Sequence, residues 1–148
     1  MTASFSHGCT FRLNGRSGSG KSTIGRALLT SLRERNIYAV VLEGDELRTG
    51  LNSNLGYNAA DRTDNLRRIE HVANLFLQQG FVTIIVTISP EQKHRDVSRQ
   101  ILRRRFIEVF VDISLKIFEA RDARGSYKRA RSGDIPGFTG VAASMKYC

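Results

Sequence analysis

The sequence predicts an α/β fold in which a parallel β-sheet is flanked by helices in a three-layer α/β/α arrangement. Two observations predict it. Four short apolar runs alternate along the chain with segments whose apolar residues recur at helical spacing. The run at 81–88 is apolar at nearly every position, which is typical of a central parallel strand with both faces covered. Because the chain has 148 residues, we expect a single domain over 1–148.

The first part of the chain is expected to hold two strands and one long helix. Residues 10–14 form the first predicted strand, which runs into a glycine-rich turn. A helix is predicted from Lys21 to about residue 36, because apolar residues recur there at one helix face: Ile24, Ala27, Leu28 and Leu32. The apolar run 38–42 is predicted to be a buried strand, and the polar segment 46–60 a loop or a short helix.

The second part of the chain repeats the alternation. A long helix is predicted over 61–80, with Asp61 as its N-cap and a glycine at its end. The central strand follows, and after it we expect a basic helix over 91–104, a strand over 106–111 and a helix over 114–120. The remaining residues are glycine-rich, basic and only weakly periodic.

Polar residues interrupt this pattern where each predicted strand ends. The breaks are 14–20, Glu43 to Asp45, Ser89-Pro90 and Asp112. Ligands of open parallel sheets bind at the carboxyl ends of the strands, so we expect the chemistry of this protein at that edge.

Residues 15–22 match the pattern G-x-x-x-x-G-K-[ST], with a predicted strand before it and an amphipathic helix after it. Glycines permit positive φ, so successive N–H groups curl around a phosphate at the positive end of the helix. Lys21 supplies charge for the β- and γ-phosphates, and Ser22 supplies a hydroxyl for Mg²⁺. We therefore expect a P-loop NTPase fold with an ATP site formed by Gly15, Arg16, Ser17, Gly18, Ser19, Gly20, Lys21, Ser22 and Thr23.

Phosphoryl transfer also needs a carboxylate near the metal or the nucleophile. Asp45 ends the second predicted strand, which lies beside the first if the sheet is doubly wound. It is a candidate to accept a proton from a substrate hydroxyl or to hold a metal-bound water, and a turn or helix cap is the alternative. Arginine forks that suit phosphate or sulfate follow it, although a solvated helix face also explains them: Arg48, Arg62, Arg67 and Arg68.

The charge balance limits the class of partner. Lys and Arg number 23 and Asp and Glu 14, which gives a net charge of +9. The positive residues lack the interleaved aromatic pattern of an RNA-binding sheet, so we expect phosphorylated small molecules rather than nucleic acid. We expect no transmembrane helix, no membrane partner and no secretory signal. The two cysteines form no metal-binding cluster and fit a reducing, cytoplasmic location.

Several longer motifs closely resemble adenylylsulfate kinase. The run 43–52 is followed by Leu55-Gly56-Tyr57 and by the pattern Asp61-Arg62-x-x-Asn65-x-Arg67-Arg68. Further matches follow in the family's order: Ile88-Ser89-Pro90, residues 106–112, Arg121-Asp122, Lys128-x-Ala130-Arg131 and Phe138-Thr139-Gly140. Together these motifs cover about residues 11–141 of the chain.

The resemblance implies transfer of the γ-phosphate of ATP to the 3′-hydroxyl of adenosine 5′-phosphosulfate (APS), the phosphorylation step of sulfate activation, with Mg²⁺ as cofactor. It implies that Asp45 lies near that hydroxyl and acts in catalysis with Lys21 and Ser89. The other implied APS contacts are Arg48, Tyr57, Arg62, Asn65, Ile88, Lys128 and Phe138, with Tyr57 and Phe138 on either face of the adenine. Arg121, Arg131 and Thr139 are implied contacts of ATP, within a lid at about 121–140.

The sequence departs from the family's pattern at a few positions, which keep alternatives open. Glu43 replaces the usual Asp, Ser126 replaces a Leu, and Glu91-Gln92 replaces an aromatic residue and an Arg, so another nucleotide-like acceptor is one alternative. The family's final strand and helix are not expected after Val141, which leaves a catalytically weak nucleotide-binding homologue as another. A homodimer is expected, because it would cover the exposed sheet edge. For Tyr57 and Phe138, core packing is the alternative to adenine binding.

Overall fold

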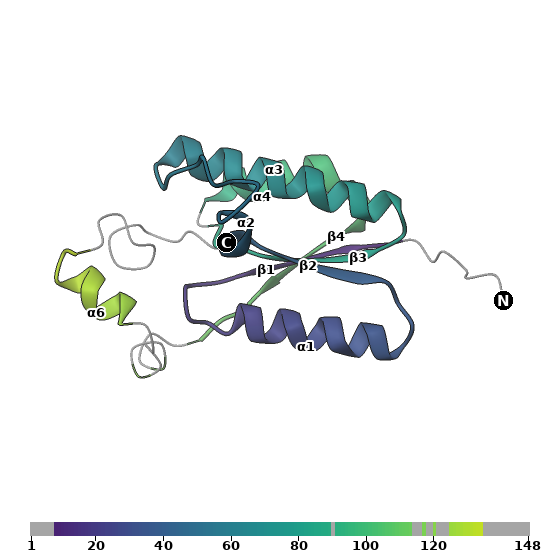
Figure 1. Cartoon of the computed structure of the whole chain (residues 1–148), viewed down its shortest axis with the longest axis horizontal. Helices are drawn as coiled ribbons and strands as arrows, with labels where there is room; N and C mark the ends of the chain where they lie inside the picture. Colours follow the sequence, from purple (N-terminus) through teal and green to yellow (C-terminus); the bar gives the residue numbers. More distant parts are fainter. Residues whose placement is uncertain (1–7, 90, 114–116, 118–119, 121–124, 135–148) are drawn as a thin grey trace.

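The computed structural model describes residues 8–89, 91–113, 117, 120 and 125–134, and within them four strands form one parallel sheet. The order across the sheet is β2 (Ala39–Glu43), β3 (Val82–Val86), β1 (Thr10–Asn14) and β4 (Phe106–Phe110). Helix α1 (Lys21–Glu34) covers one face, while α3 (Ala59–Gln78) and α4 (Gln92–Leu102) cover the other (Figure 1). The predicted three-layer α/β/α fold is confirmed.

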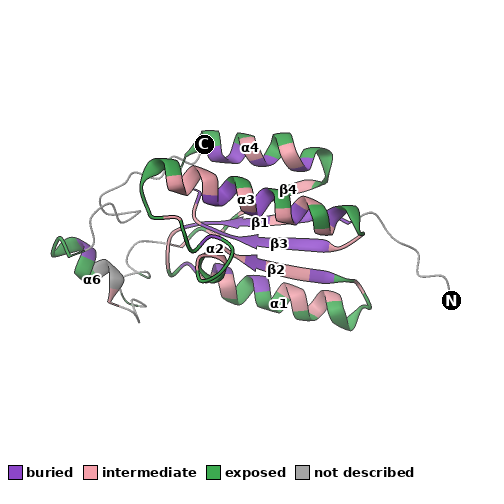
Figure 2. Cartoon of the chain, turned by 45° about the horizontal axis from the view of Figure 1, so that its top comes forward, coloured by how far each residue is buried: buried purple, intermediate pink, exposed green. Residues whose placement is uncertain are grey.

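The position of β3 corrects one expectation. The second strand was expected beside the first if the sheet is doubly wound, but β3, which was predicted to be central, lies between β2 and β1 and pairs with both. All five residues of β3 are buried, whereas β2 and β4 at the edges are partly exposed (Figure 2). A strand with apolar side chains on both faces buries more apolar surface at the centre of a sheet than at its edge. This explains why β3 is a central strand.

The two faces of the sheet carry separate apolar cores. Leu13, Ile84 and Val86 pack against the leucines of α1. A close approach of α1 requires Gly25, because a Cβ at this position would lie 3.0 Å from Cγ2 of Val86. The opposite core consists of residues from the sheet, α3 and α4: Leu42, Ile69, Ala73, Leu77, Ile85 and Leu102.

The start of α3 corrects a second expectation. Asn58, not Asp61, is the N-cap, and its side chain accepts a hydrogen bond of 2.8 Å from the backbone N–H of Asp61. The Asp61 carboxylate instead accepts bonds from the Gly56 N–H at 2.8 Å and the Asn58 amide at 2.9 Å. The Asp61 side chain therefore stabilises the loop that precedes the helix. Because Asp61 lies three residues after Asn58, its backbone N–H can bind the cap while its carboxylate binds the loop.

The other elements are short. Helix α2 (Gly44–Leu47) follows β2 directly, a 3₁₀ turn (Arg103–Arg105) precedes β4, and α6 (Ser126–Arg131) lies beyond the same end of the sheet as the turn between β1 and α1 (Figure 1). Of the helix expected over 114–120, the structure describes only residues 117 and 120, both of them helical, and most of the segment after it lies outside the described residues. Among the residues that the structure describes, no helix is long and apolar enough to cross a membrane.

Candidate nucleotide-binding and phosphoryl-transfer site

The turn between β1 and α1 forms a loop whose backbone N–H groups can bind an anion. Gly15, Gly18 and Gly20 have φ of 152°, 82° and 88°, which favour glycine. A Cβ on Gly15 would lie only 2.7 Å from the carbonyl oxygen of Val111. Gly20 is the N-cap of α1 and provides no side-chain cap, so the positive end of this helix faces the loop.

Lys21 folds back over this loop. Its Nζ donates hydrogen bonds to the carbonyl oxygens of Gly15 at 2.9 Å and Arg16 at 2.6 Å, and it lies 3.4 Å from Oγ of Ser19. The side chain is buried, which lowers the pKa of Lys21 to about 8, while the negative charge of Asp45 acts in the opposite direction. The ammonium is thus held at the centre of the loop, where a phosphate would replace the carbonyl oxygens as its partner.

This pKa predicts how ATP affinity depends on pH. In the free protein, Lys21 loses its charge as the pH rises above about 8. Bound phosphates favour the charged form, so binding takes up a proton in this range and the Kd of ATP rises, by up to about tenfold per pH unit. Calorimetric titrations from pH 7 to 10, in buffers that differ in ionisation enthalpy, measure both the Kd and the proton uptake. The Lys21→Met variant should show no such rise, and a Kd independent of pH in the unsubstituted protein would contradict the assignment.

Ser22 and Glu43 bring two oxygen ligands together at the mouth of the loop. The Ser22 hydroxyl donates to Oε2 of Glu43 at 3.1 Å, and Arg26 holds Oε1 of the same carboxylate at 3.1 Å. Glu43 was predicted to lie at the carboxyl end of a strand but was given no role in the site, and the signal that it faces Ser22 is its place at the last position of β2. Oxygen donors of this kind fit Mg²⁺, which in kinases takes few protein ligands beside the phosphates.

Asp45 lies in the first turn of α2 and is exposed. Its negative charge raises the pKa of Lys21, although β3 separates β1 and β2, the strands that precede the two residues in the chain. Lys21 and Asp45 therefore both lie at the carboxyl edge of the sheet, Lys21 at the start of α1 and Asp45 in the short helix α2.

The segment between α2 and α3 presents an exposed aromatic ring. Tyr57 is 68% exposed, so core packing, the alternative for this residue, is excluded. The Arg48 guanidinium lies 4.5 Å from its ring centroid and donates to the carbonyl oxygens of Leu55 and Gly56 at 3.1 and 2.8 Å. Arg62 donates to the carbonyl oxygen of Tyr57 at 2.7 Å. Two arginines predicted to bind substrate thus also fix the backbone on either side of this ring.

Other predicted substrate residues differ in accessibility. Asn65 is buried and its Oδ1 accepts a bond of 2.9 Å from Asn52. Ile88 is half-buried, whereas Ser89 is fully buried with its hydroxyl bound by Arg12. Lys128 and Arg131 are exposed on α6. Arg121, Phe138 and Thr139 lie outside the described residues.

The predicted residues of the ATP loop also differ in accessibility. Ser19 is buried, Arg16 and Ser17 are half-buried, and Thr23 is exposed on the first turn of α1.

A parallel sheet with this phosphate-binding loop at its carboxyl edge defines a P-loop NTPase. The model of the adenylylsulphate kinase family matches residues 7–147, and the chain belongs to this family. The resemblance found from the sequence motifs is therefore confirmed.

Individual proteins agree with the family. The chain is 52% identical to the adenylyl-sulfate kinase of Paraburkholderia xenovorans, over 94% of this chain and 78% of that protein. It is 47% identical to adenylyl-sulfate kinase 3 of Arabidopsis thaliana, over 90% of this chain and 65% of that protein, which is just under two thirds. The APS kinase of Mycobacterium tuberculosis, solved in complex with AMPPNP and APS, superposes with a TM-score of 0.92 at 41% identity, over 96% of this chain and 84% of that one.

Proposed function

We propose that this protein transfers the γ-phosphate of ATP to the 3′-hydroxyl of APS, giving 3′-phosphoadenosine 5′-phosphosulfate and ADP. The observation that carries the proposal is the position of Lys21, which is buried in the phosphate loop with the charge of Asp45 acting on it from α2. The family match supports the same reaction. A solved relative that binds both an ATP analogue and APS supports the pairing of these two substrates.

The ATP side acts by positioning and charge. Backbone N–H groups of the loop and the positive end of α1 bind the β- and γ-phosphates, and Lys21 exchanges its carbonyl partners for phosphate oxygens. Ser22 and Glu43 are the residues that would hold Mg²⁺ at this point. When bound, the metal supplies further neutralisation of phosphate charge. The accumulated positive charge favours the transition state, in which negative charge spreads over the transferred group.

The acceptor side orients the 3′-hydroxyl. Asp45 is exposed at the edge of the loop, so its carboxylate can accept the hydroxyl proton as the O–P bond forms. Arg48 and Arg62 frame the Tyr57 ring, on which the APS adenine stacks, and with Asn65 they bind the ribose and the phosphosulfate group. Ile88, Lys128 and Phe138 are the other expected APS contacts, and Arg121, Arg131 and Thr139 are expected to contact ATP within a lid that would exclude water.

Tyr57→Ala should weaken APS binding by about 1–3 kcal/mol, the usual contribution of one base stacked on an aromatic ring. Because the ring is 68% exposed, its removal should leave the melting temperature almost unchanged. Calorimetric titration of APS and a thermal melt measure the two quantities. Tyr38→Ala is the control, since this tyrosine is 61% exposed and directly precedes β2, at the amino end of that strand and away from the carboxyl edge of the sheet. A loss of stability with unchanged APS affinity would contradict the role.

The proposed reaction is tested by incubating the purified protein with ATP, Mg²⁺ and APS and identifying the products by mass spectrometry. We expect one phosphate to be added to APS, with ADP formed in equal amount, and ³¹P NMR should place the new group at the 3′ position. Adenosine 5′-phosphate and other nucleotide-like acceptors serve as competitors. Turnover of another acceptor in preference to APS would contradict the substrate, and binding of ATP with no transfer to any acceptor would contradict the activity.

A further inference from the structure

The face of β1 that meets α3 and α4 carries polar side chains where an apolar layer would be expected. The alternate residues of the strand that face this side are Thr10, Arg12 and Asn14, and none of them is more than 1% exposed. Arg12 lies in register with Ile85 of β3 and Glu108 of β4. A guanidinium in the middle of a core is unfavourable unless its charge and its donors are satisfied, so its partners indicate what it does there.

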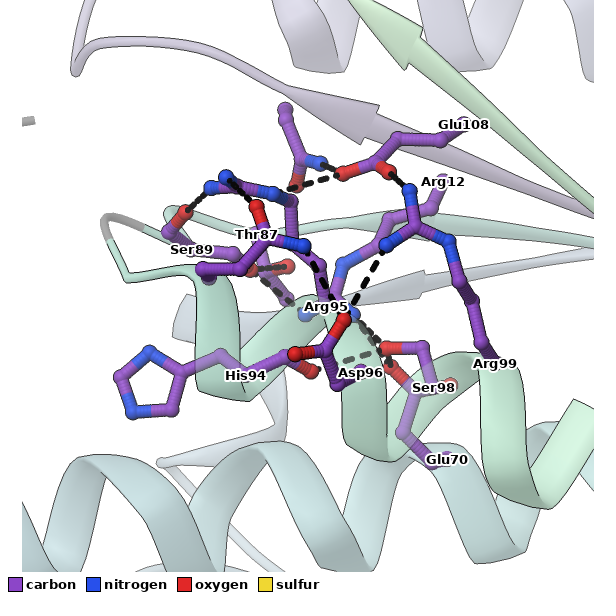
Figure 3. Close-up of polar contacts among 12 residues, drawn as sticks. Arg12, Glu70, Thr87, Ser89, His94, Arg95, Asp96, Ser98, Arg99 and Glu108 are labelled. Carbon is purple, nitrogen blue, oxygen red and sulfur yellow. Dashed lines mark hydrogen bonds and ion pairs between the residues drawn. The ribbon is translucent and has the colours of Figure 1, made fainter. Parts of the chain in front are cut away.

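One side of Arg12 is neutralised by Glu70 of α3. Nη1 of Arg12 lies 2.8 Å from Oε1 of Glu70, and both side chains are fully buried (Figure 3). Burial lowers the pKa of Arg12 and raises that of Glu70. Ser98 of α4 joins the pair by accepting a hydrogen bond from Arg12 and donating one of 2.6 Å to Glu70. These contacts balance the charge, but they use only one terminal nitrogen of the guanidinium.

The other terminal nitrogen of Arg12 points to the end of β3. Nη2 donates a hydrogen bond of 2.5 Å to Oγ of Ser89, which lies 3.3 Å from Oγ1 of Thr87. A second buried arginine, Arg95 of α4, donates to the backbone carbonyl oxygen of Ser89 at 3.4 Å and lies 3.5 Å from Glu108. Two buried guanidinium groups therefore converge on Ser89, three residues after the end of β3, one on its hydroxyl and the other on its backbone (Figure 3).

We propose that Arg12 is a positioning residue for the acceptor half of the site, and that it acts by fixing Ser89 and the strand end 87–89. This inference rests on the proposed function. The Arg12 side chain is fully buried and donates a hydrogen bond to Ser89, so we expect its effect on the site to pass through Ser89. A hydroxyl that accepts the Arg12 hydrogen bond must direct its own proton elsewhere, and Thr87 is the partner within reach. The strand end is therefore held in one arrangement before APS binds, which lowers the cost of orienting the acceptor.

The test needs variants that separate positioning from charge burial. Removing Arg12 alone would leave Glu70 buried and unpaired, so Arg12→Met is combined with Glu70→Met, which replaces the pair with apolar side chains of similar length. Arg12→Lys is the second variant, because one ammonium keeps a positive charge near Glu70 but lacks the fork that spans Glu70 and Ser89. Ser98→Ala is the matched control, since it removes a network partner of Arg12 that makes no hydrogen bond to Ser89.

Two readouts are measured on each folded variant. The first is amide hydrogen exchange of residues 86–89 in the free protein, which we expect to be faster in both Arg12 variants and unchanged in the control. The second is steady-state kinetics, where kcat/KM for APS should fall by about 100-fold while the Kd of ATP stays unchanged. The losses caused by Ser89→Ala and by the Met pair should be less than additive when the two are combined, because Arg12 acts through that hydroxyl.

Several results would overturn the inference. Unchanged exchange at 86–89 would show that Arg12 does not hold the strand end. Faster exchange with normal kcat/KM for APS would show that fixing the strand end does not contribute to the reaction. Equal losses of kcat/KM for APS and of ATP affinity would indicate general damage to the protein. If the unsubstituted protein does not phosphorylate APS, the proposed function fails, and the exchange readout alone then decides whether Arg12 fixes Ser89.

Discussion

Lys21→Ala is expected to lower kcat for APS phosphorylation by about 10³-fold while the protein remains folded. The reason is that Lys21 is the buried cation at the centre of the phosphate loop, and removing one such group from a phosphoryl-transfer site takes away charge stabilisation in the transition state. Its hydrogen bonds join residues of the same turn, so the sheet and its two apolar cores do not depend on them. Rapid-quench or coupled ADP assays measure kcat, and circular dichroism checks the fold.

Arg33→Ala provides the matched control for this variant. Arg33 also lies on α1, but in its last turn, about 18 Å along the helix from Lys21, so removing its charge should leave kcat unchanged. Near-normal turnover by the Lys21→Ala protein would show that the loop does not bind the transferred phosphate.

Asp45→Asn is expected to lower kcat by about 10²- to 10⁴-fold with little change in the KM of ATP. The substitution keeps the size and exposure of the side chain but removes the base that accepts the 3′-hydroxyl proton. Initial rates at varied ATP and APS concentrations separate the two parameters. Glu46→Gln is the control, because Glu46 is the next residue of the same turn and is also exposed.

The same variant has a second expected effect, on pH dependence. The negative charge of Asp45 raises the pKa of Lys21 toward its ordinary value, against the effect of burial. Without that charge the pKa of Lys21 falls below 8, so the loss of ATP affinity on raising the pH should begin at a lower pH than in the unsubstituted protein. For the kinetic prediction, a lower APS affinity with normal kcat in the Asp45→Asn protein would indicate that Asp45 only helps to bind the acceptor.

The sequence predicts most of the elements because their signals are local. The glycines, Lys21 and Ser22 lie within one turn and the start of one helix, so their arrangement follows from the motif itself. The apolar run at 81–88 indicates a strand buried on both faces, and β3 is buried throughout. The order of the strands is set by which surfaces cover one another, and for that reason the central place of β3 was predicted but its two neighbours, β2 and β1, were not.

Two parts of the site depend on contacts between distant residues. The bond between Ser22 and Glu43 joins α1 to β2, and the charge of Glu43 gave no hint of which side chain it would meet. Arg12 was not among the residues that the sequence indicated, and its partners lie 58, 77 and 86 residues away in Glu70, Ser89 and Ser98. Such pairs exist only after the sheet and both helices have packed, so a motif that is read along the chain does not contain them.

The N-cap of α3 shows the same limit at short range. Asn58 and Asp61 are both good caps and lie three residues apart, so either could begin the helix. The structure uses both: Asn58 caps the helix, and Asp61 binds the N–H of Gly56, just before the exposed ring of Tyr57. Composition alone does not distinguish these two roles, because the same side chain suits each of them.

The central claim is that the loop at 15–22 binds the triphosphate while the segment from Asp45 to Arg62 presents the acceptor to it. A crystal structure of the protein with Mg²⁺, a non-hydrolysable ATP analogue and APS tests this most directly. The γ-phosphate should contact Nζ of Lys21, and the APS 3′-oxygen should lie about 3–3.5 Å from the γ-phosphorus, on the side of Asp45. A nucleotide bound away from the loop, or APS bound with its 3′-oxygen turned away from Asp45, would contradict the claim.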